Sequence, residues 1–411
     1  MKHIRIISRI LLGLVFIFSG FVKGIDPMGG AIKFSEYFEV FHLSWLEPAS
    51  LVLSITLSTA EFLIGVALLI GLRMRVTAWA ALLFMSFFTL LTLYSAIKNP
   101  VKDCGCFGDA LVITNWQTFY KNIVLIIIAI FIFYSKEKFI PYCKPLMEWM
   151  WVIFFAALGV RIFVYCYQHL PIMDFRPYSI GTYIPSKMVT PPGAPVDEYK
   201  IIYYYEKNGV VKEFPVINNQ FNPPEDSTWK YKDRKDKLVK EGYKPPIHDF
   251  SINTENGEDI TNKVIADTCY SFIFIAQDAR KVKPTLWKKI QDYYHFSVDQ
   301  GYKFYILTSS PRSTTGRIKD ENHLIFDFHY ADETTLKTMI RSNPGLMLLK
   351  NGTVLAMWHY NDFPQTSYFK GNILSNVMTD FNKSMEWKRI FMLSLGFLLI
   401  IMALLWRRNK L

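Results

Sequence analysis

The residues best suited to chemistry are Cys104 and Cys106, which stand on either side of Gly105. Two thiols this close can form a disulfide, but the ring is small and its geometry is tense. A strained disulfide exchanges readily with other thiols. Gly105 lets the backbone bend enough to bring the sulfurs together, and Gly108 indicates a turn directly after them. The pattern predicts a dithiol that cycles between its reduced and oxidised forms.

Two other interpretations of the pair stay open at this point. A static disulfide could staple the loop, although closing so short a loop gains little chain entropy. The thiols could also ligate a metal, but no Cys-x-x-Cys pair or histidine cluster supplies further ligands, so we expect no metal site. Cys104 and Cys106 are therefore the candidate catalytic residues, and Gly105, Phe107 and Gly108 are candidate supporting residues.

The composition indicates a membrane protein with a large polar part. Of the 411 residues, 51% are hydrophobic and 16% are aromatic, which is high for a soluble chain. The net charge is +11, yet residues 170–387 hold 27 Lys and Arg against 26 Asp and Glu. The basic excess therefore belongs to the apolar part, where it sets membrane orientation and gives no argument for binding nucleic acid.

Six apolar stretches approach the ~20 residues that a helix needs to cross a bilayer. They cover residues 4–22, 48–72, 76–97, 118–134, 146–167 and 390–406. Residues 29–47, which follow the first stretch, predict a short amphipathic helix at the membrane interface.

Basic residues predict the orientation of these spans. If the N-terminus is cytoplasmic, six alternating crossings place all four basic clusters on the same side. The clusters are Arg5 and Arg9; Arg73 and Arg75; Lys136, Lys138 and Lys144; and Arg407, Arg408 and Lys410. The alternation puts both loop cysteines and residues 170–387 outside, where disulfides persist. We expect a multi-pass protein of a bacterial inner membrane, with cytoplasmic termini and a periplasmic domain.

Glu61 lies near the middle of the second expected span. A carboxylate within a bilayer is costly and indicates a functional role by default. The alternative is a protonated or hydrogen-bonded side chain that meets Ser54, Ser58 or Thr59.

Three motifs in residues 1–140 resemble the DoxX/MauE group of four-helix membrane proteins. They are Phe-Ser-Gly-Phe-Val-Lys at 18–23, Glu-Phe-Leu-Ile-Gly at 61–65, and the Cys-Gly-Cys-Phe-Gly loop at 104–108. The resemblance implies a bundle linked to thiol–disulfide or quinone-coupled electron transfer, supported by Lys23 and Glu61. A membrane quinone is the cofactor that it implies. The chain departs from the group by a fifth span (146–168), a large outer region and a sixth span (388–407).

Residues 170–241 predict a linker, a β-hairpin and a charged helix outside the membrane. Two apolar runs on either side of Asn208-Gly209 predict the hairpin. Asp226 or Ser227 is expected to cap the helix, which should end near residue 241.

Residues 242–381 alternate between expected strands and helices, which predicts an α/β domain. The strands are expected at 270–276, 303–307, 324–328, 346–349 and 353–358, with a helix at 285–296. This order resembles a membrane-tethered thioredoxin-like domain, in which Asn343-Pro344 stands where the family has a cis-proline. The position of the family's Cys-x-x-Cys motif, residues 277–281, holds no cysteine, and Cys269 is expected to be a buried apolar residue. We expect a non-catalytic domain that binds a protein partner near Pro344.

The expected architecture is an α-helical membrane bundle with an extracytoplasmic, thioredoxin-like α/β domain. Two functions fit it. One is a membrane oxidoreductase that exchanges disulfides or electrons with an extracytoplasmic protein or thiol partner. The alternative is a non-catalytic scaffold or assembly factor whose disulfide is structural.

Overall fold

The computed structural model describes residues 2–101, 103–139, 144–216, 221, 223, 224, 226, 228–240 and 242–408. Two residues with sequence-based expectations lie outside this set, the candidate cap Ser227 and Lys410 of the last basic cluster. The chain forms two compact units, Met1–Thr182 with Ser251–Leu411, and Tyr183–Phe250.

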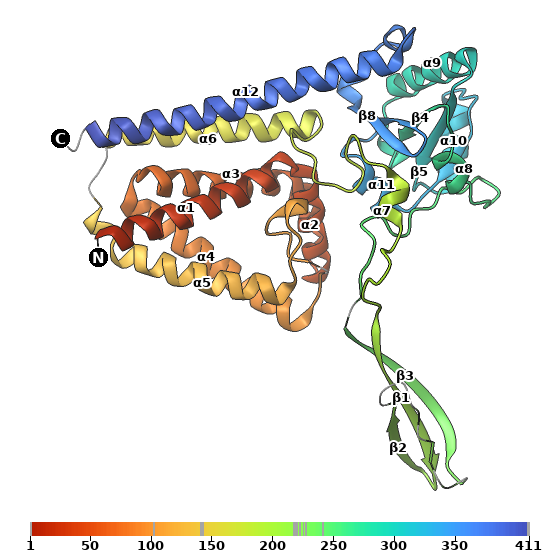
Figure 1. Ribbon diagram of the computed structural model, residues 1–411, viewed down its shortest axis with the longest axis horizontal. Helices are drawn as coiled ribbons and strands as arrows, with labels where there is room; N and C mark the ends of the chain where they lie inside the picture. Colours follow the sequence, from red (N-terminus) through yellow and green to blue (C-terminus); the bar gives the residue numbers. More distant parts are fainter. Residues whose placement is uncertain are drawn as a thin grey trace. The chain divides into compact units, whose positions relative to one another are not determined.

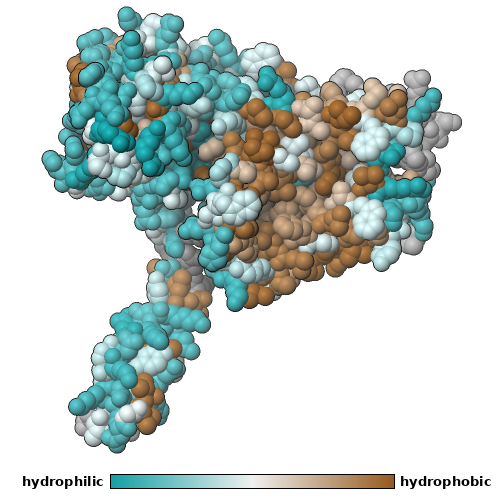
Figure 2. Space-filling model, turned by 180° about the vertical axis from the view of Figure 1, so that it is seen from behind, coloured by the Kyte–Doolittle hydropathy of each residue, from teal (hydrophilic) through white to brown (hydrophobic). Residues whose placement is uncertain are grey.

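Five apolar helices confirm the first five spans expected from the sequence. They are α1 (Lys2–Ile25), α3 (Ser50–Ile70), α4 (Met74–Lys98), α5 (Asn115–Tyr134) and α6 (Pro145–Gln168). Figure 1 shows them side by side, and Figure 2 shows that the face they present in that view is largely apolar, as contact with lipid chains requires.

Helices α1 and α3 pack closely because glycines lie at their contact. A Cβ added at Gly20 would lie 2.5 Å from the backbone nitrogen of Phe62, and one at Gly65 would lie 2.5 Å from the α1 backbone. Small residues permit such packing in a bilayer, where the hydrophobic effect does not drive helices together. The contact brings Lys23, at the end of α1, to Glu61 in α3.

Helix α2 (Pro27–Val40) is the short helix expected after the first span. Asp26 caps it, because its carboxylate accepts a hydrogen bond of 2.9 Å from the backbone N–H of Gly29. The expected helix extended to residue 47, but α2 ends earlier and a 3₁₀ turn, η1 (Ser44–Ala49), leads into α3.

Helix α12 (Ile373–Arg408) contains the sixth expected span. Most of its side chains from residue 391 onward lie outside the described set. Its crossing of the membrane therefore stays a prediction.

The predicted α/β domain is present and contains a five-stranded sheet. The strand order is β6-β5-β4-β7-β8; β4, β5 and β6 run parallel, and β7 and β8 each run antiparallel to the preceding strand in this order. The peptide bond between Asn343 and Pro344 is cis. The strands are β4 (Tyr270–Ile275), β5 (Lys303–Thr308), β6 (Phe328–Tyr330), β7 (Gly345–Lys350) and β8 (Thr353–His359), and the helices are α8 (Thr261–Ile265), α9 (Pro284–Gln300), α10 (Arg312–Glu321) and α11 (Glu333–Met339).

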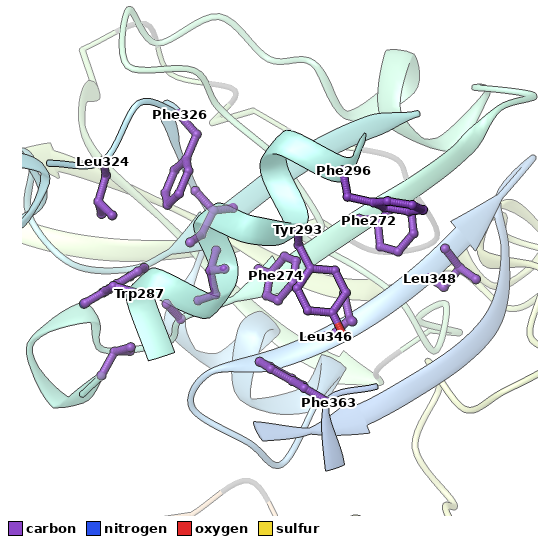
Figure 3. Packing of buried hydrophobic residues seen from close by; sticks show 14 of the residues in the cluster. Phe272, Phe274, Trp287, Tyr293, Phe296, Leu324, Phe326, Leu346, Leu348 and Phe363 are labelled. Carbon is purple, nitrogen blue, oxygen red and sulfur yellow. The ribbon is translucent and has the colours of Figure 1, made fainter. Parts of the chain in front are cut away.

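An aromatic core joins the sheet to α9. Phe272 and Phe274 alternate along β4 and contact Tyr293 of α9, as Figure 3 shows. The strand expected at 324–328 is shifted, because pairing with β5 starts only at Phe328. The expected burial of Cys269 is wrong, since this residue is exposed just before β4.

The unit Tyr183–Phe250 contains a short helix, α7 (Ile184–Met188), and a three-stranded antiparallel sheet in the order β2-β1-β3. The predicted hairpin is confirmed: β1 (Glu198–Lys207) and β2 (Val210–Pro215) are joined by Asn208-Gly209, both with positive φ.

The charged helix expected near residues 226–241 is wrong, because this segment forms strand β3 (Lys230–Lys240). The segment lacks an apolar face with helical spacing, so nothing would hold a helix against the rest of the unit. As a strand it satisfies its backbone by pairing with β1. Its side chains meet the tyrosines of β1, with Tyr231 beside Tyr205 and Arg234 over Tyr203.

Candidate functional site

The cysteine loop, residues 103–109 between α4 and α5, holds the sulfurs of Cys104 and Cys106 3.3 Å apart and unbonded. Gly105 and Gly108 have φ values of +64° and +51°, a region that side-chain-bearing residues rarely adopt. The N–H of Gly108 donates to the carbonyl of Gly105 at 3.1 Å. The N–H of Gly105 donates to Asp103 Oδ1 at 3.0 Å. These two tight turns bring the thiols together.

The loop is fixed to the bundle by Phe107, the residue after the second cysteine. This residue is 8% exposed, and its ring packs against the ring of Phe18, with centroids 5.6 Å apart. The ammonium of Lys121, from α5, lies 4.2 Å from the same ring in a cation–π contact. The hydroxyl of Ser19, from α1, donates to the carbonyl of Cys106 at 2.7 Å. The supporting role expected for Phe107 therefore has a structural basis.

The two cysteines have different surroundings. Cys104 lies next to α2, where the Tyr37 hydroxyl is within hydrogen-bonding reach of its thiol. The adjacent Asp103 pairs with Lys33 of α2 at 3.3 Å. Cys106 instead lines a cavity of about 30 Å³ inside the bundle. The other lining residues include Lys23, Glu61, Phe84, Phe88, Phe107 and Lys121.

Lys23 and Glu61 form an ion pair between α1 and α3 beside this cavity. The Glu61 side chain is 7% exposed and that of Lys23 is 17% exposed. The hydrogen bonds suggested for Glu61 are not seen among the described residues, because Ser54 donates to the Pro27 carbonyl and Thr59 to that of Ile55. The ion pair reduces the free-energy cost of placing a carboxylate within the membrane, and it places two charges near Cys106.

The thiols differ in acidity because they share one hydrogen bond. That bond with Cys104 lowers the pKa of Cys106 to about 6, with further help from the positive charges of Lys121 and Lys23 and against the effect of burial. The same bond, together with burial, raises the pKa of Cys104 above its ordinary value. The shared hydrogen bond therefore favours the thiolate form at Cys106 over that at Cys104. A thiolate is the form that attacks a disulfide.

The residues expected to bind a partner lie in the α/β domain, next to β7. The side-chain amide of Asn343 donates to the Asp278 carbonyl at 2.9 Å, and Pro344 is buried. Gln277, the first residue of the segment 277–281, donates to the carbonyl of Ile340 at 2.6 Å.

Sequence reasoning missed Lys121 and Arg341. Lys121 lies inside an expected span, and an intramembrane cation is a signal that could have identified it. Arg341 pairs with Asp26 and Asp109, at separations of 315 and 232 residues along the chain, which no local pattern indicates.

The five apolar helices and the cysteine loop define the class of the protein, a multi-pass membrane protein with a dithiol loop between two spans. Residues 1–135 match the family described as methylamine utilisation protein MauE, so this part of the chain is MauE-like. Residues 199–241 match a domain of unknown function, DUF8463, which covers the three-stranded sheet.

The chain is also similar to Protein TlpB of Flavobacterium psychrophilum. The two are 26% identical over 135 residues, which is 32% of this chain and 36% of the relative. The match thus spans about a third of each protein and leaves most of both unmatched. No solved structure significantly matches the chain.

Proposed function

We propose that the protein is an integral membrane thiol–disulfide redox protein that exchanges disulfides or electrons with an extracytoplasmic protein or thiol partner. The observation that carries the proposal is the Cys104–Cys106 pair, 3.3 Å apart, with a thiolate favoured at Cys106 beside Lys121 and Lys23. A depressed thiol pKa is a feature of reactive rather than structural cysteines. The similarity of residues 1–135 to MauE and to a protein named TlpB supports a redox or maturation role.

The chemistry follows from the difference between the thiols. The Cys106 thiolate attacks one sulfur of a partner disulfide, a mixed disulfide forms, and the partner's other sulfur leaves as a thiolate. Cys104 then loses its proton and attacks Cys106, which forms the Cys104–Cys106 disulfide and releases the partner as a dithiol. Two electrons pass from the pair to the partner, and the reverse sequence oxidises a partner dithiol.

A membrane quinone does not fit the cavity beside Cys106 in this conformation. Its volume of about 30 Å³ admits one or two water molecules. Cavities that hold a small organic ligand are typically ~300 Å³ or larger. We therefore derive no step through a quinone.

The α/β domain is proposed to be thioredoxin-like. Its order β5-β4-β7-β8, with one parallel and two antiparallel pairings, supports this assignment. We also propose a bacterial inner-membrane location with cytoplasmic termini and residues 170–387 in the periplasm, on the basis of the basic clusters. A reporter that is active only in the periplasm, fused after Leu411, should be inactive.

The direct test is the redox state of Cys104 and Cys106 in cells. Rapid acid quenching followed by alkylation should find a mixture of reduced and oxidised protein, and Cys104→Ser should accumulate mixed disulfides through Cys106. A pair that is always oxidised, resists mild dithiols and traps no partner would support the alternative, a non-catalytic scaffold with a structural disulfide.

A further inference from the structure

Helix α2 packs against the part of the cysteine loop that carries Cys104. The ammonium of Lys33 lies 3.3 Å from Asp103 Oδ2 and 3.0 Å from Glu36 Oε2. The side chain of Lys33 also runs along the loop backbone, because a Cβ added at Gly105 would lie 3.2 Å from the Lys33 Cγ. Helix α2 thus contacts the loop at the residue before Cys104 and at the residue after it.

The hydroxyl of Tyr37 reaches the thiol that lies between these two contacts. It forms a hydrogen bond with the sulfur of Cys104. The hydroxyl of Ser95, near the end of α4, lies 3.3 Å from the Tyr37 oxygen, and Ser95 is fully buried. Residues four apart share a face of a helix, so Lys33 and Tyr37 both face the loop. Cys104 therefore meets a phenol hydroxyl whose position is fixed from two helices.

Towards an ionised sulfur, the Tyr37 hydroxyl can act only as a hydrogen-bond donor. Burial raises the pKa of Tyr37 above its usual range, and the neighbouring Cys104 sulfur adds to this shift. The hydroxyl therefore keeps its proton at the pH values at which thiols titrate. The hydrogen bond with Cys106 and burial raise the pKa of Cys104, whereas donation from Tyr37 and the charge of Lys121 oppose that rise.

This donor matters most in the second step of disulfide exchange. Once Cys106 has attacked a partner disulfide, its sulfur is bonded to the partner and is no longer a thiolate. Cys104 must then lose its proton and attack Cys106. Among the described residues, Cys106 and Tyr37 hydrogen-bond to the Cys104 sulfur, so in the mixed disulfide the hydroxyl remains to stabilise the new thiolate. Hydrogen bonds to ionised acceptors are roughly twice as strong as those between neutral groups.

We propose that Tyr37 is a catalytic residue of the resolving step, in which its hydroxyl donates to the Cys104 sulfur as that thiol ionises and closes the disulfide. The Cys104–Cys106 bond forms and the bond from Cys106 to the partner breaks. The partner sulfur leaves with the electron pair, and the proton of Cys104 goes to the solvent. Lys33 and Ser95 are positioning residues that hold the loop and the hydroxyl. The inference rests on the proposed function and adds a residue to its mechanism.

The first test measures the acidity of Cys104 without its partner thiol. The chain has five cysteines, and full-length protein in which the other four are replaced by alanine keeps Cys104 alone. In this background Tyr37→Phe should raise the pH midpoint of iodoacetamide alkylation by about one, a shift that corresponds to one hydrogen bond to an ionised group. The matched control is Tyr120→Phe, the same change at a tyrosine of α5 that is 61% exposed, and it should leave the midpoint unchanged.

The second test follows the two steps with Ellman's reagent, an aromatic disulfide whose thiolate is coloured. The full-length reduced protein keeps both loop thiols and has alanine at its other cysteines. Cys106 releases the first coloured thiolate, and Cys104 releases the second. Tyr37→Phe should leave the first release unchanged in rapid mixing. It should slow the second about threefold at pH 7, because a tenfold smaller thiolate fraction is partly offset by a more nucleophilic thiolate.

The pH dependence separates a catalytic role from a structural one. The threefold difference should shrink towards pH 9, where more of the Cys104 thiol is ionised in both proteins. Ser95→Ala keeps the phenol hydroxyl but removes a group that fixes it, so it should slow the second release less than Tyr37→Phe does.

The outcomes distinguish this inference from the proposed function. An unchanged alkylation midpoint or an unchanged second release in Tyr37→Phe would overturn the inference alone. Equal slowing of both releases at every pH would also overturn it, because Tyr37 would then only maintain the shape of the loop. If the protein with both loop thiols releases no coloured thiolate, the proposed function fails and the inference fails with it.

Discussion

The cysteine loop and residues 277–281 of the α/β domain, where the resemblance to thioredoxin-like domains would place a Cys-x-x-Cys motif, use their side chains differently. In the loop, two thiols stand beside Lys121, an ion pair and a small cavity. In residues 277–281, the described hydrogen bonds join the segment to itself and to neighbouring parts of the domain. Asp278 binds Arg280 with two bonds of 2.9 Å, and the N–H of Ala279 donates to Ser310 Oγ at 2.9 Å. The comparison teaches that, of these two regions, the cysteine loop alone carries the thiols that disulfide exchange needs.

The largest expected effect on the difference between the two regions comes from removing both loop thiols. In an insulin-reduction assay with dithiothreitol as reductant, Cys104→Ser/Cys106→Ser should lower the catalysed rate to background, because no thiolate is left to attack. Helical content should be unchanged, since a three-residue disulfide ring contributes little to stability. Exposed Cys269 is the control, and Cys269→Ser should leave the rate intact. Activity that survives in the double variant would assign the chemistry to the α/β domain.

The next effect separates the two cysteines. At pH 7, Cys106→Ser should slow alkylation by about a hundredfold, because the pKa of Cys106 is about 6 and a remaining Cys104 titrates near or above an ordinary thiol. Cys104→Ser should slow alkylation far less than Cys106→Ser does. It should also raise the pH midpoint of alkylation, since only the hydrogen bond to the Cys106 thiolate is lost. Iodoacetamide kinetics measured from pH 5 to 10, in a background in which the exposed Cys269 is replaced by serine, report the alkylation rate and its midpoint pH. Similar rates for the two variants would contradict the assignment of Cys106 as nucleophile.

A smaller effect tests the cation in α5. Lys121→Met removes a positive charge that lowers the pKa of Cys106, so the alkylation midpoint should move to higher pH. A rise of the pKa by about one would reduce the rate near pH 6 roughly fivefold and leave the rate above pH 9 unchanged. Lys121→Arg keeps the charge and should keep the profile. A uniform loss at all pH values would indicate damage to the loop instead.

The smallest effect is expected for residues 277–281 of the α/β domain. Asp278→Ala removes the carboxylate that accepts a hydrogen bond from the Arg280 N–H. We expect a loss of about 1 kcal/mol in the free energy of unfolding, as for other helix-capping residues, measured by denaturant titration. Exchange with Ellman's reagent should stay at the wild-type rate. A fall in that rate without loss of stability would show that residues 277–281 take part in the chemistry.

The sequence alone identified the five membrane helices, the cysteine loop and the positions of most strands in the α/β domain. These features depend on local composition and spacing, such as an apolar run of about twenty residues. The hairpin at Asn208-Gly209 was likewise predicted from a signal that lies within a few residues of the turn. Residues 230–240 were predicted as a helix because charges and a possible cap are weak local signals, and pairing with β1 decided otherwise.

Only the tertiary structure decided which charges surround the thiols and which residue joins the α/β domain to the cysteine loop. Glu61 was recognisable as an unusual residue, but its partner became clear only when glycines let α1 and α3 approach closely. Lys121 gains its importance from the fold of the loop over α5. Arg341 lies far along the chain from Asp26 and Asp109. Electrostatic interactions depend on distance through space and on burial, and a sequence pattern specifies neither for residues so far apart.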